Sequence, residues 1–291
     1  SPEVGGMGHS VKRKEDPRFI RGQGNYVDDV VRPGMVFMDI VRSPYAHAKI
    51  KSINTDKALA HPGVAAVITG ETLKEYNLHM MPTLMSDTQM VLPIDKVCYQ
   101  AQEVAAVVAT DRYSAADGVE LVEVEYEPLP VVVDPHKATD SDAPIIRDDK
   151  EGQENNHIFH WEAGDKEGTE EIFKNADVTV KQDIYLPRIH VASIETCGCV
   201  SEFDSVTGQL TVWMTTQAPH AIRTVLALVA GHVGLQEDKI SVISPDIGGG
   251  FGGKVPVYPG YVIAIAASVV TGLPIKWIED RRENLQADSF A

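Results

Sequence analysis

The sequence predicts an α+β chain of two folded units joined by a polar linker, and three observations support this class. Between residues 35 and 135, apolar runs of strand length alternate with short segments of helical spacing. Residues 136–176 are mostly polar and charged. From residue 177 to 291, strand-like runs dominate and two apolar helical segments follow. Hydrophobic residues form 43% of the 291 residues, which is typical of a chain with a buried core.

The first unit follows an arm, residues 1–34, that is rich in Gly, Pro and charge and is expected to be extended with turns. Alternating or continuous apolar patterns predict its strands at 35–43, 47–54, 64–70, 103–110 and 123–135. Helices are expected at 56–63, which ends in Pro-Gly, and at 111–122, where Asp111 is the predicted N-cap.

The second unit, residues 177–291, is read in the same way. The expected strands are 177–187, 194–204, 209–216, 239–244 and 273–278. The expected helices are 219–235, from its i, i+3, i+4 apolar spacing, and the small-residue segment 261–272. The last run, EDRRENLQADSFA, stops in mid-element. We therefore expect this unit to be incomplete, as the front part of a longer chain or one piece of a split subunit.

Composition excludes several classes of function. The net charge of −16, from 26 basic and 42 acidic residues, argues against nucleic acid or an anionic membrane as a partner. No apolar run approaches the roughly 18–20 residues of a membrane span, and the first residues are not a signal peptide. Three cysteines, two of them in a C-x-C pair, argue against a disulfide-stapled secreted protein, so a cytoplasmic location is expected. The ten histidines show no H-E-x-x-H spacing, and no metal held directly by protein ligands is expected.

The main candidate site is the stretch SPDIGGGFGGK at 244–254, which carries five glycines in six positions around Phe251. One interpretation is a tight structural turn. A second is a phosphate loop, but the Walker pattern needs a hydroxyl where Val255 stands, and a G-x-G-x-x-G match lacks an acidic ribose partner. The third is that the N–H groups of residues 249–253 bind a bulky anionic cofactor directly, with Phe251 as a rigid wall that excludes water.

Several stretches resemble one enzyme family. DIGGGFGGK is similar to the molybdopterin-binding loop of the molybdenum hydroxylases, which include xanthine dehydrogenase, aldehyde oxidase and aerobic carbon monoxide dehydrogenase. KRKEDPRFIRGQGNYVDD and DRYSAADGVELVEVEYEPLPVVVDP resemble the opening of the large subunit and the end of its α/β-hammerhead domain. TTQAPHAIRTVLA and KWIEDRRENL resemble the start of its cofactor-binding domain. The resemblance implies a hammerhead domain at 35–135 and the first part of a mixed α/β molybdopterin-binding domain at 177–291.

The resemblance also implies site residues. Gln217 matches the glutamine whose side-chain amide lies beside an oxo group of the molybdenum, and an amide N–H₂ is a suitable donor there. The alternative is that Gln217 caps the following helix. The residues expected to hold the cofactor are Gln217 and the loop residues Gly249, Gly250, Phe251, Gly252 and Gly253, with Gln217 and Phe251 also counted as catalytic. Lys254 is either a charge near this site or a helix-start residue.

Three further residues stand in the strand-like run IETCGC. Glu195 could be catalytic, but a structural ion pair with Arg188 or Arg223 is the favoured interpretation. Cys197 and Cys199 alternate on one strand, face the same side and are expected to be buried thiols. In this family the metal is held by the dithiolene sulfurs of the pterin, so the absence of protein ligands is expected.

The family reaction is an oxidative hydroxylation with water as the oxygen source. The resemblance implies molybdopterin, as the cytosine dinucleotide, with FAD and [2Fe-2S] clusters in a flavin-binding medium subunit and an iron–sulfur subunit. The base glutamate and any copper-binding cysteine have no counterpart in these residues. We therefore expect copper, if used, to be bound by a missing segment, and turnover to need the remainder of the large subunit.

The substrate is inferred from smaller cues. Purine-oxidising members have a glutamate directly after the loop lysine, where this chain has Val255, so xanthine is disfavoured. IETCGCVSEFD and VPVYPGYV are most similar to carbon monoxide dehydrogenases, but Gly253 stands where those enzymes usually carry Asn. An aldehyde or N-heteroaromatic hydroxylase is the alternative. A non-catalytic scaffold, with the glycine loop as a relic, is the alternative from a different class; intact Gln217 and Phe251 argue against it.

Overall fold

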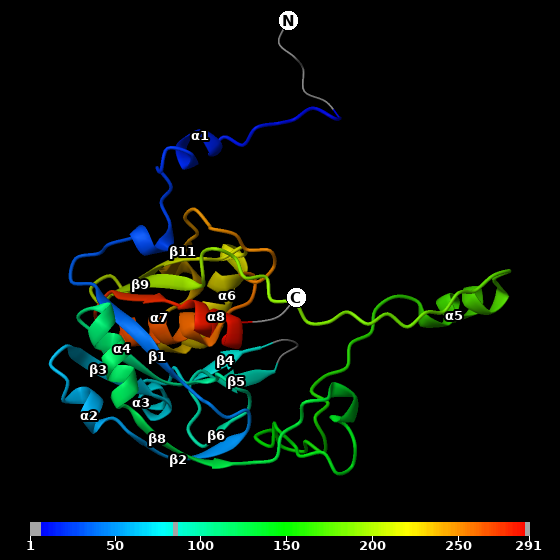
Figure 1. Ribbon diagram of the computed structural model, residues 1–291, viewed down its shortest axis with the longest axis horizontal. Helices are drawn as coiled ribbons and strands as arrows, with labels where there is room; N and C mark the ends of the chain where they lie inside the picture. The colour runs from blue at the N-terminus through cyan, green and yellow to red at the C-terminus, as the bar shows by residue number, and fades with distance from the viewer. Residues whose placement is uncertain (1–6, 84–86, 289–291) are drawn as a thin grey trace, which may run out of the picture.

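The computed structural model describes residues 7–83 and 87–288, and a seven-stranded mixed sheet forms the centre of the described fold (Figure 1). The strand order in this sheet is β11-β10-β9-β12-β1-β7-β3. In chain order, its strands are β1 (Val36–Arg42), β3 (Val64–Thr69), β7 (Glu103–Ala109), β9 (Gly198–Asp204), β10 (Gln209–Met214), β11 (Ile240–Ile243) and β12 (Ile275–Ile278). Strand β1 pairs with β12 in parallel and with β7 in antiparallel orientation. Strands from both predicted units therefore share one sheet, and the boundaries at 135 and 177 stay a prediction.

Two small sheets complete the β structure. One has the order β6-β2-β8 and consists of β2 (Ala48–Asn54), β6 (Lys96–Val97) and β8 (Glu123–Pro128). The other pairs β4 (Met80–Pro82) with β5 (Thr88–Met90). Strands β4, β5 and β6 were not predicted, because such short runs carry little apolar periodicity.

The helices follow the predicted order, with additions. The α-helices are α1 (Asp16–Phe19), α2 (Asp56–Leu59), α3 (Gly70–Glu75), α4 (Arg112–Leu121), α5 (Lys166–Asn175), α6 (Pro219–Ala230), α7 (Pro259–Thr271) and α8 (Arg281–Ala287). Short 3-10 turns lie at Val27–Asp29, Pro135–Lys137, Gly231–Val233 and Glu237–Lys239. The predicted N-cap is confirmed, since the Asp111 carboxylate accepts the Ser114 N–H at 2.9 Å. Among the described residues, no helix is both long and apolar enough to span a membrane.

Helix α7 is the central helix of the core. Its residues are buried almost all round, and it packs against β9 and β12. The close approach depends on Gly260, because a Cβ there would lie 2.3 Å from the Trp277 ring. Tyr261 meets the same ring edge-on, with centroids 5.5 Å apart. A small-residue helix is therefore what this sheet can accommodate.

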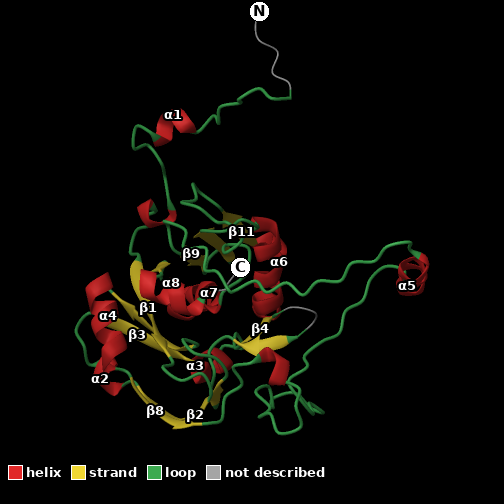
Figure 2. Ribbon diagram, turned by 45° about the vertical axis from the view of Figure 1, so that its right-hand side comes forward, coloured by secondary structure: helices red, strands yellow, loops and turns green. Residues whose placement is uncertain are grey.

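The predicted strand at 177–187 is wrong: the segment is extended but pairs with no strand among the described residues. Its alternating apolar side chains are exposed, with Val178 at 79%, Val180 at 84% and Ile184 at 76%. Strand hydrogen bonds need a neighbouring edge, and the described part of the chain offers none here. The segment returns from α5, which lies far from the sheet in both views (Figures 1 and 2).

Helices α5 and α8 were missed, although both carry start signals. The Asp165 carboxylate accepts the Gly168 N–H at the start of α5, inside the predicted linker. In α8, Asp280 and Glu283 form a capping box, each side chain accepting the other's backbone N–H. Charged sequence around these caps hid the short helices from a search for apolar periodicity.

A buried ionic cluster connects β1 with α8. Arg42 lies 2.9 Å from both Glu103 and Glu283 and 3.8 Å from Glu279. Burial raises the pKa of Glu279 to about 9. Beside it the Asn284 amide donates to Asp288 at 2.6 Å. This cluster holds together strands that are far apart in the sequence.

Candidate functional site

The glycine loop, residues 248–253, lies between β11 and α7 and has an unusual backbone (Figure 1). Gly249 and Gly252 have φ of 98° and 90°, values that favour glycine. Phe251 has φ of 50°, a left-handed conformation that costs a non-glycine residue about 1–2 kcal/mol. Strain of this kind persists where the surrounding contacts hold it, and it is frequent at binding sites.

At the other three positions, glycine is required because a side chain would collide with its neighbours. A Cβ on Gly248 would lie 2.5 Å from the Glu195 Cβ, and one on Gly250 would lie 2.5 Å from the Gln217 Cδ. A Cβ on Gly253 would lie 2.7 Å from a Val191 methyl. The loop therefore runs directly over the side chains of neighbouring segments, which explains why five glycines are concentrated here.

The structure places Gln217 under this loop, in the connection between β10 and α6. Its Oε1 accepts the N–H of Gly252 at 3.0 Å and of Lys254 at 3.3 Å. Its own backbone N–H donates to the Lys254 carbonyl at 2.9 Å. Helix α6 has Ala218 as N-cap, with no side-chain cap, so Gln217 does not cap it. Within the described ranges its Nε2 has no acceptor, so the N–H₂ group of this exposed side chain is left for a ligand.

The loop N–H groups divide into two sets. Gly252 donates to Gln217, and Gly253 donates to the Gly250 carbonyl at 2.9 Å. The N–H groups of Gly249, Gly250 and Phe251 have no acceptor in the part of the chain that the structure describes. Of the five N–H groups predicted to bind the cofactor, three are therefore free, because Gln217 and the Gly250 carbonyl accept the other two. Successive free N–H groups of this kind suit anionic oxygens.

Glu195 and Lys254 form a pair beneath the loop. Lys254 is 2% exposed, and its Nζ lies 3.0 Å from the Glu195 Oε2. The same oxygen accepts the Gly248 N–H at 2.7 Å. The predicted structural ion pair of Glu195 is present, but among the described residues its cation is Lys254 and not Arg188 or Arg223; Arg223 lies 3.7 Å from Glu237. Lys254 is not a helix-start residue either, since α7 begins at Pro259.

The N-terminal arm contacts Asp246, which lies two residues before the glycine loop. Arg18 donates through both terminal nitrogens to the Asp246 carboxylate, which also accepts the Asn25 N–H at 2.8 Å. The hydrogen bond from Arg18 lowers the pKa of Asp246. No pattern in the sequence predicted this contact, whose partners are 228 residues apart.

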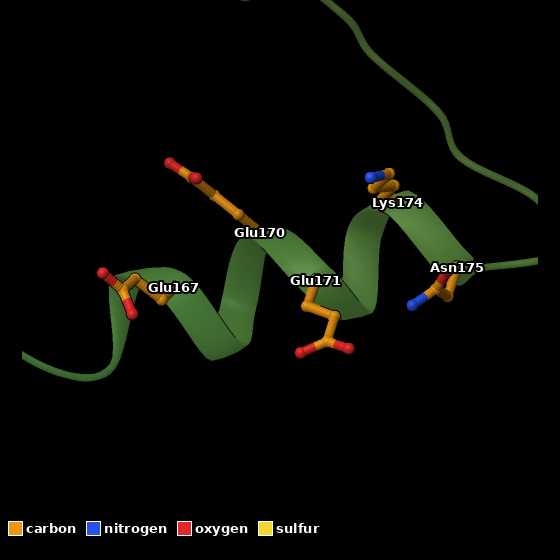
Figure 3. Close-up of a pocket in the computed structure, with 5 residues that line it drawn as sticks. All are labelled: Glu167, Glu170, Glu171, Lys174 and Asn175. Atoms are coloured by element: carbon orange, nitrogen blue, oxygen red, sulfur yellow. The ribbon is translucent and has the colours of Figure 1, made fainter.

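The site faces outward, since the Phe251 side chain is 74% exposed. Cys197 and Cys199 are buried thiols as predicted, and desolvation raises the pKa of both. Two shallow hollows lie elsewhere. One lies against α5, where the five labelled side chains come from this one helix and point to different sides (Figure 3). The other lies at the end of α6. Neither hollow includes a residue of the glycine loop.

The role of Gln217 can be tested by Gln217→Glu. A carboxylate keeps an acceptor for the Gly252 and Lys254 N–H groups but cannot donate to a bound anion. We expect the chain to fold and assemble as before, with cofactor content reduced about tenfold or more by the lost donor and the added charge. The molybdenum content of the natively purified Gln217→Glu variant measures this loss. The control is Gln209→Glu, an equivalent substitution at an exposed residue of β10. Equal content in both variants would remove Gln217 from the site.

Two family models match most of the chain. Residues 149–291 match the molybdopterin cofactor-binding domain, and residues 21–130 match the hammerhead domain of aldehyde oxidase and xanthine dehydrogenase. The carbon monoxide dehydrogenase large chain of Afipia carboxidovorans is 57% identical over 98% of this chain, and that of Hydrogenophaga pseudoflava is 54% identical over 99%. This chain spans only 36% and 37% of their lengths.

Solved structures agree with these matches. A Cu,Mo-carbon monoxide dehydrogenase in its reduced state is 57% identical, with a TM-score of 0.88 over 98% of this chain and 37% of its own. Quinoline 2-oxidoreductase from Pseudomonas putida 86 is 32% identical, with a TM-score of 0.81 over 98% of this chain and 36% of its own. The chain belongs to the molybdenum hydroxylase family, in which it corresponds to the hammerhead domain and molybdopterin cofactor-binding domain of the large subunit.

Proposed function

We propose that this chain is the cofactor-cradling part of the catalytic subunit of a carbon monoxide-oxidising molybdenum hydroxylase. The observation that carries the proposal is the glycine loop, where three adjacent N–H groups and the Gln217 amide are left without acceptors in the described structure. The 57% identity with a carbon monoxide dehydrogenase large chain supports the substrate.

The residues of the loop fit an anionic pterin cofactor. In this proposal Gly249, Gly250 and Phe251 donate their N–H groups to it, while Gln217 donates from its Nε2. Gly252 and Gly253 stabilise the loop instead of binding the ligand, because their N–H groups already donate to Gln217 and Gly250. The exposed Phe251 ring lines the open face. When bound, the cofactor supplies the redox-active molybdenum at which the family oxidises its substrates. The cytosine dinucleotide form is part of the proposal.

A second candidate is an aldehyde or N-heteroaromatic hydroxylase. The nicotine 6-hydroxylase large subunit of Paenarthrobacter nicotinovorans is 36% identical over 98% of this chain, and the quinoline enzyme shares the fold. Gly253 favours this candidate. The asparagine that carbon monoxide dehydrogenases usually carry there would need Val191 to move, since a Cβ at this position would lie 2.7 Å from its methyl.

The proposal includes partner polypeptides, namely the remainder of the large subunit, an iron–sulfur subunit with [2Fe-2S] clusters and a flavin-binding medium subunit with FAD. The exposed apolar side chains of the extended segment after α5 support a partner that covers them; they include Val178, Val180, Ile184, Tyr185, Leu186 and Ile189. Val178 and Val180 alternate with polar residues, as they would in a strand added to the edge of a partner's sheet.

Molybdenum and copper content of the complex purified natively through this chain tests the function. We expect molybdenum with an equimolar amount of copper, as the Cu,Mo relative suggests. Molybdenum without copper would reject carbon monoxide oxidation in favour of the aldehyde or heteroaromatic candidate. Neither metal, with partner subunits present, would contradict the catalytic proposal and support a scaffold.

A further inference from the structure

We propose that Glu195 and Lys254 are positioning residues, whose partly buried ion pair fastens both ends of the glycine loop so that its three free N–H groups point at the cofactor. Lys254 in this view does not bind the cofactor itself. The inference rests on the proposed function, because it concerns how the same loop is held.

The contacts place the pair at both ends of the loop. At the first end, the Glu195 Oε2 accepts the Gly248 N–H at 2.7 Å, and the Glu195 N–H donates to the Gly248 carbonyl at 3.2 Å. At the other end, Lys254 donates from its Nζ to the same Oε2 at 3.0 Å. One carboxylate oxygen therefore connects the residue that opens the loop with the residue that follows it.

The Lys254 backbone belongs to the same arrangement. Its N–H donates to the Gln217 Oε1, and its carbonyl accepts the Gln217 backbone N–H. A shift of Lys254 would therefore move the amide whose N–H₂ group is proposed to reach the cofactor. It would also disturb the left-handed conformation of Phe251, which the neighbouring contacts must maintain.

Burial argues against a direct role for the ammonium group. The Lys254 side chain is 2% exposed, whereas Gln217 and Phe251, which mark the open face, are exposed. The ammonium group and the carboxylate together carry no net charge, so the pair below the loop attracts a phosphate above it only weakly. Removing one member of a buried pair leaves the other unpaired, and this loss is larger than the loss of the pair as a whole.

A double-mutant cycle in the natively purified complex tests the proposal. The variants are Lys254→Met, Glu195→Gln and the double variant. The amide oxygen that Glu195→Gln introduces can still accept the Gly248 N–H. We expect each single variant to retain about tenfold less molybdenum per chain during dialysis, and the double variant to recover to within about threefold of the parent. Amide hydrogen exchange of residues 248–254 should follow the same order, independently of the cofactor.

Lys57 and Glu123 provide matched controls, since they form an exposed ion pair of the same residue types, at 62% and 54% side-chain exposure. Lys57→Met and Glu123→Gln should change neither readout. A double variant as poor as Lys254→Met in metal retention would overturn the proposal and make Lys254 a cofactor ligand. Unchanged loop exchange in the single variants would also overturn it. A parent complex without molybdenum would instead contradict the proposed function, while the exchange order would still report on the pair.

Discussion

Gly250→Val is expected to weaken cofactor retention strongly while leaving the body of the fold intact. A Cβ at this position would lie 2.5 Å from Cδ and 2.6 Å from Oε1 of Gln217, closer than real contacts allow. Either Gln217 or the loop must move, and both carry the proposed donors. Overpacking of this kind costs about 1–3 kcal/mol, which corresponds to a loss of about fivefold to more than a hundredfold in binding.

Molybdenum per chain in the natively purified complex measures this effect. Gly231→Val is the matched control, because a Cβ at Gly231 would meet nothing within 4 Å and the residue lies outside the loop. The control should keep its metal and its assembly with partner subunits. Normal metal content in Gly250→Val would refute the idea that the loop backbone holds the cofactor.

Arg42→Met is expected to give the largest loss of stability in the chain. The side chain is 11% exposed and lies within 4 Å of Glu103, Glu279 and Glu283. Methionine fills a similar volume but leaves three carboxyl groups, of which Glu279 is protonated at neutral pH, without their common cation. Breaking a buried ionic group in this way costs about 3–5 kcal/mol.

Urea unfolding, followed by the shift in midpoint at constant slope, measures this loss. Arg13→Met is the control, because the ion pair of Arg13 with Asp16 is mainly exposed and should contribute about 0–1 kcal/mol. A loss below about 1 kcal/mol for Arg42→Met would mean that the carboxylates are protonated or solvated without Arg42.

The raised pKa of Glu279 predicts that the stability of the parent chain depends on pH, and pH 6 and pH 8 are the conditions to compare. The carboxyl of Glu279 titrates near 9 in the fold and near 4.5 when unfolded. For such a group the free energy of unfolding falls as pH rises between those values.

The sequence by itself determined the local elements and the kind of site. Strand β7 was readable because a continuous apolar run predicts a fully buried strand, and its residues are all buried. Helix α4 was readable because Asp111 can satisfy N–H groups that any helix start leaves free. The glycine loop and its resemblance to the molybdopterin loop needed only a contiguous stretch of residues. Each of these signals acts between near neighbours in the chain.

Only the tertiary structure decided how these pieces work together. It joined β1 to β12 in one sheet, left the 177–187 segment without a partner among the described residues, and paired Glu195 with Lys254. It also decided which loop N–H groups stay free, because Gln217, 35 residues before Gly252, accepts the N–H groups of Gly252 and Lys254. The physical reason is that hydrogen bonds and ion pairs depend on distances in space. Local patterns set the backbone state of a residue, but its partners are set by which segments the fold brings within about 3 Å.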